Sequence, residues 1–325
     1  MQEMKLTISD IREETPLVRT LSLRAADGSP LPPFAPGAHL QVRIPGLADA
    51  RCYSLVTFAP EAGSFEAPQT YRLGVRLEAE SSGGSRFMHA LKLGDTLTVS
   101  GPKNDFPLHA AEADETETVL IAGGIGITPI AAMASALQAA GRPWSMHYSG
   151  RSLDQLAFKD ELAVLAGPAL HLHADDDAAT RLDIDALLDT LSTTQHLYVC
   201  GPKGMIDAVI EGAKKRGWPA CHVHFELFTS AAPMAGDQPF EVELSQSGQV
   251  LIIPADKTIV DVLEEAGCDP MYDCKRGECG VCTVTVLEGE PDHRDYFLSD
   301  AEKASGKLIQ ICISRAKSAR LVLDL

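Results

Sequence analysis

The chain has 325 residues, eight cysteines and a formal net charge of −17. The acidity disfavours binding to nucleic acid or to anionic lipid surfaces, no apolar run reaches the length of a membrane span, and residues 1–10 lack the apolar stretch of a secretory signal. The length predicts two or three domains, and eight cysteines without a secretory signal favour metal chemistry in a reducing, cytoplasmic compartment over disulfide bonds.

The first hundred residues alternate between short apolar segments and turn-forming residues. Strand-like alternation covers residues 5–24, and a run rich in Pro, Gly and Ala follows. Further expected strands are 39–44, 53–56, 71–77 and 96–99. Short strands at this spacing predict a small antiparallel barrel.

Two segments of this barrel suggest a phosphate site. One is Arg51-Cys-Tyr53-Ser54-Leu55, and the other is Ser82-Gly-Gly84-Ser85-Arg86 at the start of a short expected helix, 87–91. A glycine-rich turn at a helix start offers amide groups to a phosphate, and an arginine can bind the same group in bidentate fashion. Taken singly, the two segments can also be a surface arginine and a hairpin turn.

The middle of the chain alternates strands and helices. An apolar strand, 118–122, leads into Gly123-Gly124-Ile-Gly126-Ile-Thr128-Pro129 and a helix over 130–140. The expected elements that follow are strands 145–149, 169–174 and 196–200 and helices 153–165, 184–191 and 205–216. This alternation predicts a doubly wound parallel sheet that binds a nucleotide at the carboxyl ends of its strands.

The C-terminal region follows a segment, 229–239, whose Ala, Pro, Gly and Ser content predicts a linker. A hairpin over 240–244 and 249–253, a helix over 260–266 that Thr258 caps, and strands over 283–287, 308–313 and 320–323 outline a β-grasp domain. Residues 238–325 hold 9 Lys or Arg and 16 Asp or Glu, a net of −7.

Four cysteines of this region have the spacing of a plant-type [2Fe-2S] site. Cys274, Cys279 and Cys282 form C-x4-C-x2-C, and Cys312 follows after a long gap. Gly277 and Gly280 supply the backbone freedom that a loop around a cluster needs. Buried or disulfide-bonded cysteines are the alternative, a zinc site lacks its second C-x2-C pair, and Cys268 is a rival fourth ligand.

The chain resembles the phthalate dioxygenase reductase family over its full length. The matching segments, in order, are Arg-x-Tyr-Ser-Leu, Gly-Gly-Ser, Gly-Gly-Ile-Gly-Ile-Thr-Pro, Cys-Gly-Pro and the C-terminal cysteines. Asn104–Leu108, His293–Asp295 and the closing residues 314–325 also resemble that family. The resemblance implies a flavin barrel of the ferredoxin-reductase type over 1–112, an NAD-binding α/β domain over 117–228, the linker 229–239 and a [2Fe-2S] ferredoxin domain over 240–325.

The resemblance also implies roles for individual residues. FMN would be held by Arg51, Tyr53, Ser54, Val75, Arg76, Gly84 and Ser85. The nicotinamide would lie between Gly123, Gly124, Gly126 and Thr128 on one side and Cys200, Gly201 and Pro202 on the other. Thr128 and Cys200 would approach the reacting carbon, and Phe228 would stack on the flavin. From the residues alone, Cys200 can also be a small buried side chain and Phe228 a core aromatic.

NADH and NADPH differ by a 2′-phosphate. Arg151 and Ser152 follow the second strand of the expected sheet, where the adenosine ribose would lie, and an arginine can bind the 2′-phosphate. The acidic run Asp175-Asp-Asp177 would repel it. The resemblance favours NADH.

The expected function is the reductase component of a multicomponent Rieske-type oxygenase, in which a monomer passes electrons from NADH through FMN and the cluster to the oxygenase. The oxygenase would act on an aromatic acid, a methoxy-aromatic compound or a quaternary amine. The alternatives are a stand-alone flavin, ferric or ferredoxin-type reductase using NADH or NADPH, and a redox sensor whose cluster gates partner binding. No acid–base constellation is visible, and electron transfer needs none.

Overall fold

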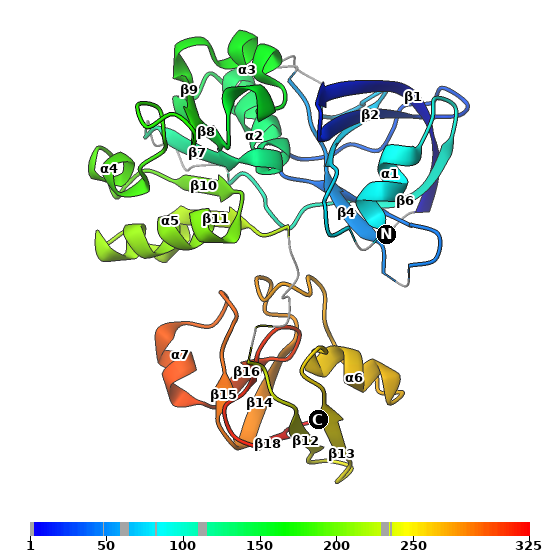
Figure 1. The fold of residues 1–325 in the computed structure, drawn as a ribbon, viewed down its shortest axis with the longest axis vertical. Helices are drawn as coiled ribbons and strands as arrows, with labels where there is room; N and C mark the ends of the chain where they lie inside the picture. The colour runs from blue at the N-terminus through cyan, green and yellow to red at the C-terminus, as the bar shows by residue number, and fades with distance from the viewer. Residues whose placement is uncertain are drawn as a thin grey trace. The chain divides into compact units, whose positions relative to one another are not determined.

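The structure is a computed structural model that describes residues 3–47, 49–58, 65–81, 83–109, 116–228, 234 and 236–325. The chain forms two compact units, Met1–Glu226 and Leu227–Leu325, which Figure 1 draws in a colour ramp from blue to red. No described helix combines the length and the apolar character that a membrane crossing requires.

The first unit begins with a six-stranded antiparallel sheet in the order β4-β3-β6-β1-β2-β5. Its strands are β1 (Glu3–Thr15), β2 (Val18–Ala25), β3 (His39–Val42), β4 (Arg51–Ser54), β5 (Tyr71–Arg76) and β6 (Thr96–Lys103). A bridge between Leu55 and Leu73 joins the two ends of the sheet, so the strands curl into the expected barrel. Apolar side chains fill its interior, and α1 (Gly84–Ala90) follows β5.

The rest of the first unit is the predicted parallel sheet, in the order β11-β10-β7-β8-β9. Its strands are β7 (Thr118–Gly123), β8 (Trp144–Gly150), β9 (Leu170–Ala174), β10 (Leu197–Cys200) and β11 (Val223–Glu226). The α-helices are α2 (Ile127–Ala139), α3 (Lys159–Ala166), α4 (Ile184–Asp189) and α5 (Lys203–Lys215). Helices α2 and α3 cover one face of the sheet, and α4 and α5 cover the other (Figure 1). This arrangement confirms the doubly wound prediction.

The helix expected over 153–165 is broken in the structure. A short 3-10 turn covers Leu153–Gln155, and α3 begins only after Phe158, which adopts left-handed φ and ψ angles of 63° and 19°. An L-residue in that conformation cannot continue a right-handed helix. The sequence shows no glycine or proline there, so the break was not predictable from helix signals.

The barrel and the parallel sheet share one hydrophobic core. Val18, Val56 and Phe106 of the barrel belong to the same buried cluster as the apolar face of α2. A continuous core explains why the two layers form one compact unit. The predicted boundary between residues 112 and 117 remains a prediction, because residues 110–115 lie outside the described part of the chain.

The second unit contains a five-stranded sheet in the order β13-β12-β18-β14-β16. Its strands are β12 (Phe240–Leu244), β13 (Val250–Ile253), β14 (Thr283–Glu288), β16 (Leu308–Gln310) and β18 (Arg320–Leu323), and a separate pair joins β15 (Pro291–Asp292) to β17 (Arg315–Ala316). Helix α6 (Ile259–Glu265) starts at the predicted cap, Thr258, whose side chain accepts from the Asp261 amide. A second capped helix, α7 (Asp300–Ser305), was not predicted.

Seven of the ten histidines lie in two clusters on the parallel sheet. The three-histidine cluster contains His147, His171 and His173, and the four-histidine cluster contains His109, His196, His222 and His224. Ring nitrogens of His147 and His173 lie 3.1 Å apart, and those of His196 and His224 lie 2.9 Å apart. Within each pair one ring donates and the other accepts, so at least one ring of the pair is neutral. This packing is what histidines with a structural role show.

We expect these histidines to make the first unit sensitive to acid. Burial, followed by the positive potential of the neighbouring rings, lowers the pKa of His147 to about 4 and that of His224 to about 3. In the unfolded chain the ordinary value is about 6.5. As the pH falls below about 6.5, the histidines therefore bind protons in the unfolded state but stay neutral in the folded state. Each histidine then lowers the free energy of unfolding by at most about 1.4 kcal/mol per pH unit.

Denaturant unfolding of the holoprotein between pH 7.5 and pH 4.5 tests this expectation. A His147→Gln/His224→Gln double variant should lose less stability over that range than the original chain, because it lacks the two histidines. The carboxylates titrate in both proteins, so their contribution cancels in the comparison. Equal losses in the two proteins would contradict the assignment. Arg142, which adds positive potential near His196, stays unchanged in both.

Candidate cofactor sites

The structure brings the two predicted phosphate-binding segments of the barrel together. A Cβ on Gly84 would lie 3.0 Å from Arg51 Cγ and 3.5 Å from Tyr53 Oη, so a glycine lets the start of α1 approach both side chains. Arg51 and Tyr53 alternate with Cys52 and therefore share one face of β4. Burial raises the pKa of Tyr53 to about 12, so the phenol stays neutral and can donate a hydrogen bond. A guanidinium, a phenol and a close backbone suit a phosphate-bearing flavin.

The other predicted flavin residues lie around this corner in different ways. Ser85 Oγ accepts from the Glu78 amide at 3.1 Å and lies 2.9 Å from Ser81 Oγ, so its hydroxyl is engaged within the turn. Ser54 is buried on the opposite face of β4 from Arg51. On β5, the Val75 side chain points into the barrel core, which leaves its backbone as the part that can line a ring.

The glycine turn after β7 packs directly on the turn after β10. A Cβ on Gly126 would lie 2.1 Å from the carbonyl oxygen of Cys200, and a Cβ on Gly123 would lie 2.6 Å from Pro202 Cδ. A Cβ on Gly201 would in turn lie 3.0 Å from the backbone Cα and N of Gly123. Only glycine permits this approach. The two segments predicted to hold the nicotinamide therefore form one edge at the carboxyl ends of adjacent parallel strands, where doubly wound sheets bind ligands.

The Thr128 and Cys200 side chains are both buried in the structure. Thr128 lies in the first turn of α2, is 1% exposed, and donates from Oγ1 to the Ile125 carbonyl at 3.0 Å. The Cys200 side chain is fully buried in the shared core, as the alternative of a small buried side chain expects, and its approach to the reacting carbon stays a prediction. Gly124 has a positive φ of 53°, which the tight turn between β7 and α2 requires.

The acidic run predicted to oppose a 2′-phosphate lies beside Arg151. The amide of Asp175 donates to the Gly150 carbonyl at 2.9 Å, and the amide of Asp176 donates to the Arg151 carbonyl at 3.1 Å. These bonds hold the acidic residues next to the end of β8. At the predicted ribose position this negative charge would disfavour NADPH relative to NADH.

The four predicted cluster ligands meet in the second unit. The Cys274 thiol interacts with those of Cys312 and Cys279, and the Cys282 thiol interacts with that of Cys312. None forms a disulfide. Among the described residues no group of three His, Cys, Asp or Glu side chains is placed to hold a metal ion. A [2Fe-2S] cluster takes two thiolates at each of two irons, and the four side chains that meet here are thiols. The donor set therefore suits this cluster.

The loop that carries three of these thiols depends on its glycines. Gly277 and Gly280 have positive φ angles of 76° and 75°, which confirms their predicted role. A Cβ on Gly280 would overlap the ring of Phe297 at 2.3 Å, so the loop also packs too closely for any side chain there. The amide of Arg276 points at Cys274 Sγ, 3.3 Å away, as the N–H···S bonds around such clusters do.

The segment that carries Phe228 is attached to the cluster loop. Leu227, the first residue of the second unit, donates its amide to Glu278 Oε1 at 2.6 Å. The Glu278 carboxylate also pairs with Arg276 at 3.0 Å, and both side chains are largely buried. Phe228 itself is 40% exposed in the described structure. Sequence reasoning did not single out Glu278, since nothing in the loop pattern marks a carboxylate that binds a distant amide.

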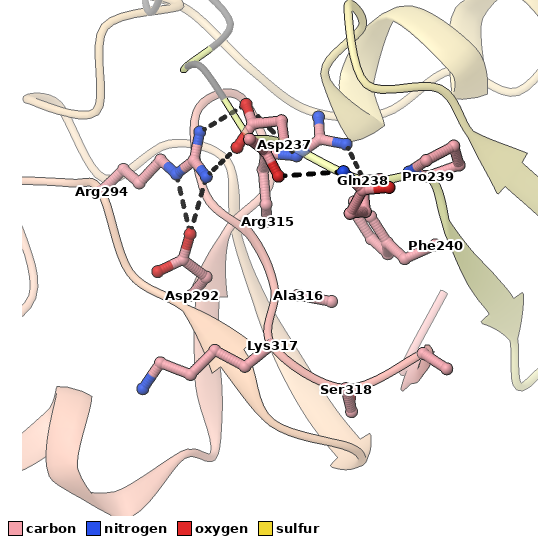
Figure 2. A pocket seen from close by; sticks show the side chains of 12 residues that line it. Asp237, Gln238, Pro239, Phe240, Asp292, Arg294, Arg315, Ala316, Lys317 and Ser318 are labelled. Atoms are coloured by element: carbon pink, nitrogen blue, oxygen red, sulfur yellow. Dashed lines mark hydrogen bonds and ion pairs between the residues drawn. The ribbon is translucent and has the colours of Figure 1, made fainter.

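A shallow pocket in the second unit contains two arginines, but both are engaged. Figure 2 shows Arg294 facing Asp237 and Asp292, with bonds of 2.6 and 3.0 Å to the two oxygens of Asp237. Arg315 donates to three backbone carbonyls at 2.8–3.1 Å and lies over the ring of Phe240. These contacts anchor the chain where the predicted linker ends. They do not leave an anion site.

Comparison with known proteins identifies two of the domains and the family. The profile of the oxidoreductase NAD-binding domain matches residues 120–211, and that of the 2Fe-2S iron-sulfur cluster binding domain matches residues 242–317. The chain is 41% identical to vanillate O-demethylase oxidoreductase of Pseudomonas sp. (strain HR199 / DSM 7063), over 99% of this chain and 100% of that protein. Phthalate dioxygenase reductase, a solved structure, is 36% identical over 99% of this chain and 98% of that chain, with a TM-score of 0.71.

The chain belongs to the phthalate dioxygenase reductase family. Membership confirms the predicted cofactors, which are FMN, NADH and a [2Fe-2S] cluster, and the predicted function of a reductase component of an oxygenase system. CYP116B46 from Tepidiphilus thermophilus is also similar, with 35% identity over 99% of this chain and a TM-score of 0.74. This chain spans only 42% of that protein.

Proposed function

We propose that this reductase delivers its electrons, as a monomer, to a Rieske-type terminal oxygenase that acts on a methoxy-aromatic acid. The Rieske class follows from the family resemblance, and the substrate class follows from the name of the 41% identical relative, a vanillate O-demethylase oxidoreductase. The observation that carries the proposal is the meeting of four thiols on a unit of its own, because a separate cluster unit suits a protein acceptor.

The bound cofactors would supply a two-electron hydride transfer from NADH to FMN, followed by two one-electron transfers through the cluster to the acceptor. The residues of the chain bind and orient these groups. Arg51, Tyr53 and the backbone at Gly84 would hold the flavin phosphate. The packed turns at Gly126 and Cys200 would fix the nicotinamide edge. The thiols of Cys274, Cys279, Cys282 and Cys312 would hold the irons.

Phe228 is proposed to cover the flavin ring until nicotinamide displaces it. Within the second unit, the Leu227 amide donates to Glu278 Oε1, which fixes the backbone next to Phe228 relative to the cluster loop. A stacked aromatic contributes about 0.5–1.5 kcal/mol beyond its buried area, and nicotinamide stacked in its place would recover a contribution of the same kind.

A haem oxygenase is the second candidate acceptor. The specific observation is the similarity to CYP116B46 and to an intact type IV self-sufficient cytochrome P450 monooxygenase, in each of which the region similar to this chain is under half of the length. Stand-alone reduction of flavins or ferric ions remains the outcome expected if no protein acceptor is reduced.

Anaerobic titration followed by visible absorption and EPR tests the electron path. NADH should bleach the flavin and produce a [2Fe-2S] signal, at a much lower concentration than NADPH. Flavin bleaching without a cluster signal would refute the proposed cysteine ligands. The reduced protein is then mixed with a Rieske oxygenase of the vanillate class or with a cytochrome P450. Rapid appearance of a reduced Rieske signal supports the proposal, and reduction of the haem alone refutes it.

A further inference from the structure

Strand β5 has one face in the barrel core and one face toward the nucleotide-binding layer. Tyr71, Leu73 and Val75 are buried in the barrel, so Arg72, Gly74 and Arg76 alternate with them on the other face. A Cβ on Gly74 would lie 2.8 Å from Thr128 Cγ2 and 3.0 Å from Phe158 Cζ. The strand that is proposed to line the flavin therefore touches the residue that is proposed to approach nicotinamide.

Arg72 fastens the two layers of the first unit immediately beside that contact. Its Nη2 donates to Glu161 of α3 at 2.9 Å and to Glu14 of β1 at 3.2 Å. Its guanidinium also lies 5.2 Å from the ring centroids of both Phe58 and Phe158, in cation–π geometry. One side chain thus joins groups from the barrel to groups from the nucleotide-binding layer.

Phe158 shows that this junction constrains the backbone. It is 2% exposed and is one of only two non-glycine residues with a positive φ in the described part of the chain; the other is Lys275 in the cluster loop. A bulky residue keeps such a conformation only where its surroundings determine it. Its ring packs 5.4 Å from Phe58, near Arg72 and over Gly74. Helix α3, which carries Glu161, begins at this residue.

We propose that Arg72 is a positioning residue that sets the separation of flavin and nicotinamide by holding Thr128 against Gly74. The inference rests on the proposed cofactor sites. Hydride transfer needs reacting atoms about 3–3.5 Å apart, and a displacement of about 1 Å can slow it on the order of 100-fold. Arg72, Gly74 and Arg76 follow one another at two-residue intervals on one face of β5, and roughly 13 Å separates the first from the last. A shift of the strand at Arg72 would therefore also move Gly74, which contacts Thr128, and Arg76, which is proposed to line the flavin.

The first test compares Arg72→Gln with Arg12→Gln in the full holoprotein. Arg12 lies on β1 of the same barrel but is exposed and pairs only locally with Asp10, so it serves as the matched control. Flavin reduction by NADH is followed by anaerobic stopped flow over a range of NADH concentrations. Arg72→Gln should retain its flavin and cluster spectra and lower the limiting rate of flavin reduction about 10- to 100-fold. The apparent Kd for NADH should change far less.

Deuterium at the transferred position of NADH separates positioning from folding. A larger isotope effect in Arg72→Gln than in the original protein would place the loss in the hydride step. An unchanged limiting rate, or a rate that falls only in proportion to lost flavin, would overturn the inference. Failure of the original protein to reduce its flavin with NADH would instead refute the proposed function.

A second pair of variants tests the contact itself. Gly74→Ala introduces a methyl group against Thr128 Cγ2 and should slow flavin reduction without releasing FMN. Thr128→Ser removes that methyl group while keeping the hydroxyl, so Gly74→Ala should slow flavin reduction less in the Thr128→Ser background than in the original chain. The part of the loss that remains would come from the Phe158 ring, 3.0 Å from the added methyl group. An equal loss in the two backgrounds would show that this contact does not set the geometry.

Discussion

Replacement of Cys279 by serine is expected to remove the [2Fe-2S] cluster and leave reduction of FMN by NADH intact. A serine hydroxyl is not a thiolate donor, and the cluster needs four thiolates. All four proposed ligands belong to the unit Leu227–Leu325, whereas the proposed FMN and nicotinamide contacts other than Phe228 belong to Met1–Glu226. The variant should lose its cluster absorption and EPR signal and its reduction of cytochrome c, while the flavin still bleaches with NADH at the original rate.

Cys268→Ser is the matched control for this experiment. Cys268 was the rival fourth ligand in the sequence, but its side chain packs against the core of the second unit and its amide donates to Leu263 at 2.9 Å. This variant should keep a full cluster signal, and Cys312→Ser should lose it. The opposite pattern would move the fourth ligand to Cys268, and loss of NADH-dependent flavin bleaching in Cys279→Ser would contradict the independence of the two units.

Gly126→Ala is expected to disable the nicotinamide site. The added Cβ would stand 2.1 Å from the carbonyl oxygen and 2.4 Å from the carbonyl carbon of Cys200. Both atoms are backbone, so the ends of β7 and β10 must separate, at a cost typical of overpacking, about 1–3 kcal/mol. A displacement of about 1 Å at the reacting groups corresponds to a loss on the order of 100-fold in the rate of flavin reduction by NADH.

Dithionite and a second glycine provide the controls. Dithionite should still bleach the flavin of Gly126→Ala, because it does not use the nucleotide site. Gly204→Ala adds a methyl group to the first turn of α5, where nothing lies within 4 Å, and should leave the rate unchanged. A normal rate of reduction by NADH in Gly126→Ala would mean that the β7 and β10 turns do not form the nicotinamide edge.

The two candidate sites can be proposed from the sequence because the residues that would form them lie in local patterns. The cluster pattern from Cys274 to Cys282 follows from the reach of thiolates on one loop, and Gly277 and Gly280 follow from the backbone that such a loop requires. The turn at Gly123–Gly126 follows a buried strand and precedes a helix, which is the local signature of a nucleotide site. The individual roles of Thr128, Cys200 and Phe228 came from the family resemblance, and they remain proposals that the variants above test.

The sequence by itself determined the order of the strands and helices, the glycine turn of the nucleotide-binding layer and the cluster loop, because strand periodicity, turn glycines and thiolate spacing are local properties. FMN and NADH came from the family resemblance. Only the tertiary structure decided how the sites are held. Three contacts that hold the sites join residues 51 to 89 positions apart. They are the contact of Gly74 with Thr128, the ion pair of Arg72 with Glu161 and the hydrogen bond from Leu227 to Glu278. The left-handed Phe158 belongs with them, since its conformation is fixed by packing and not by its own preference. No local pattern encodes such contacts, because each depends on the surface that another element presents.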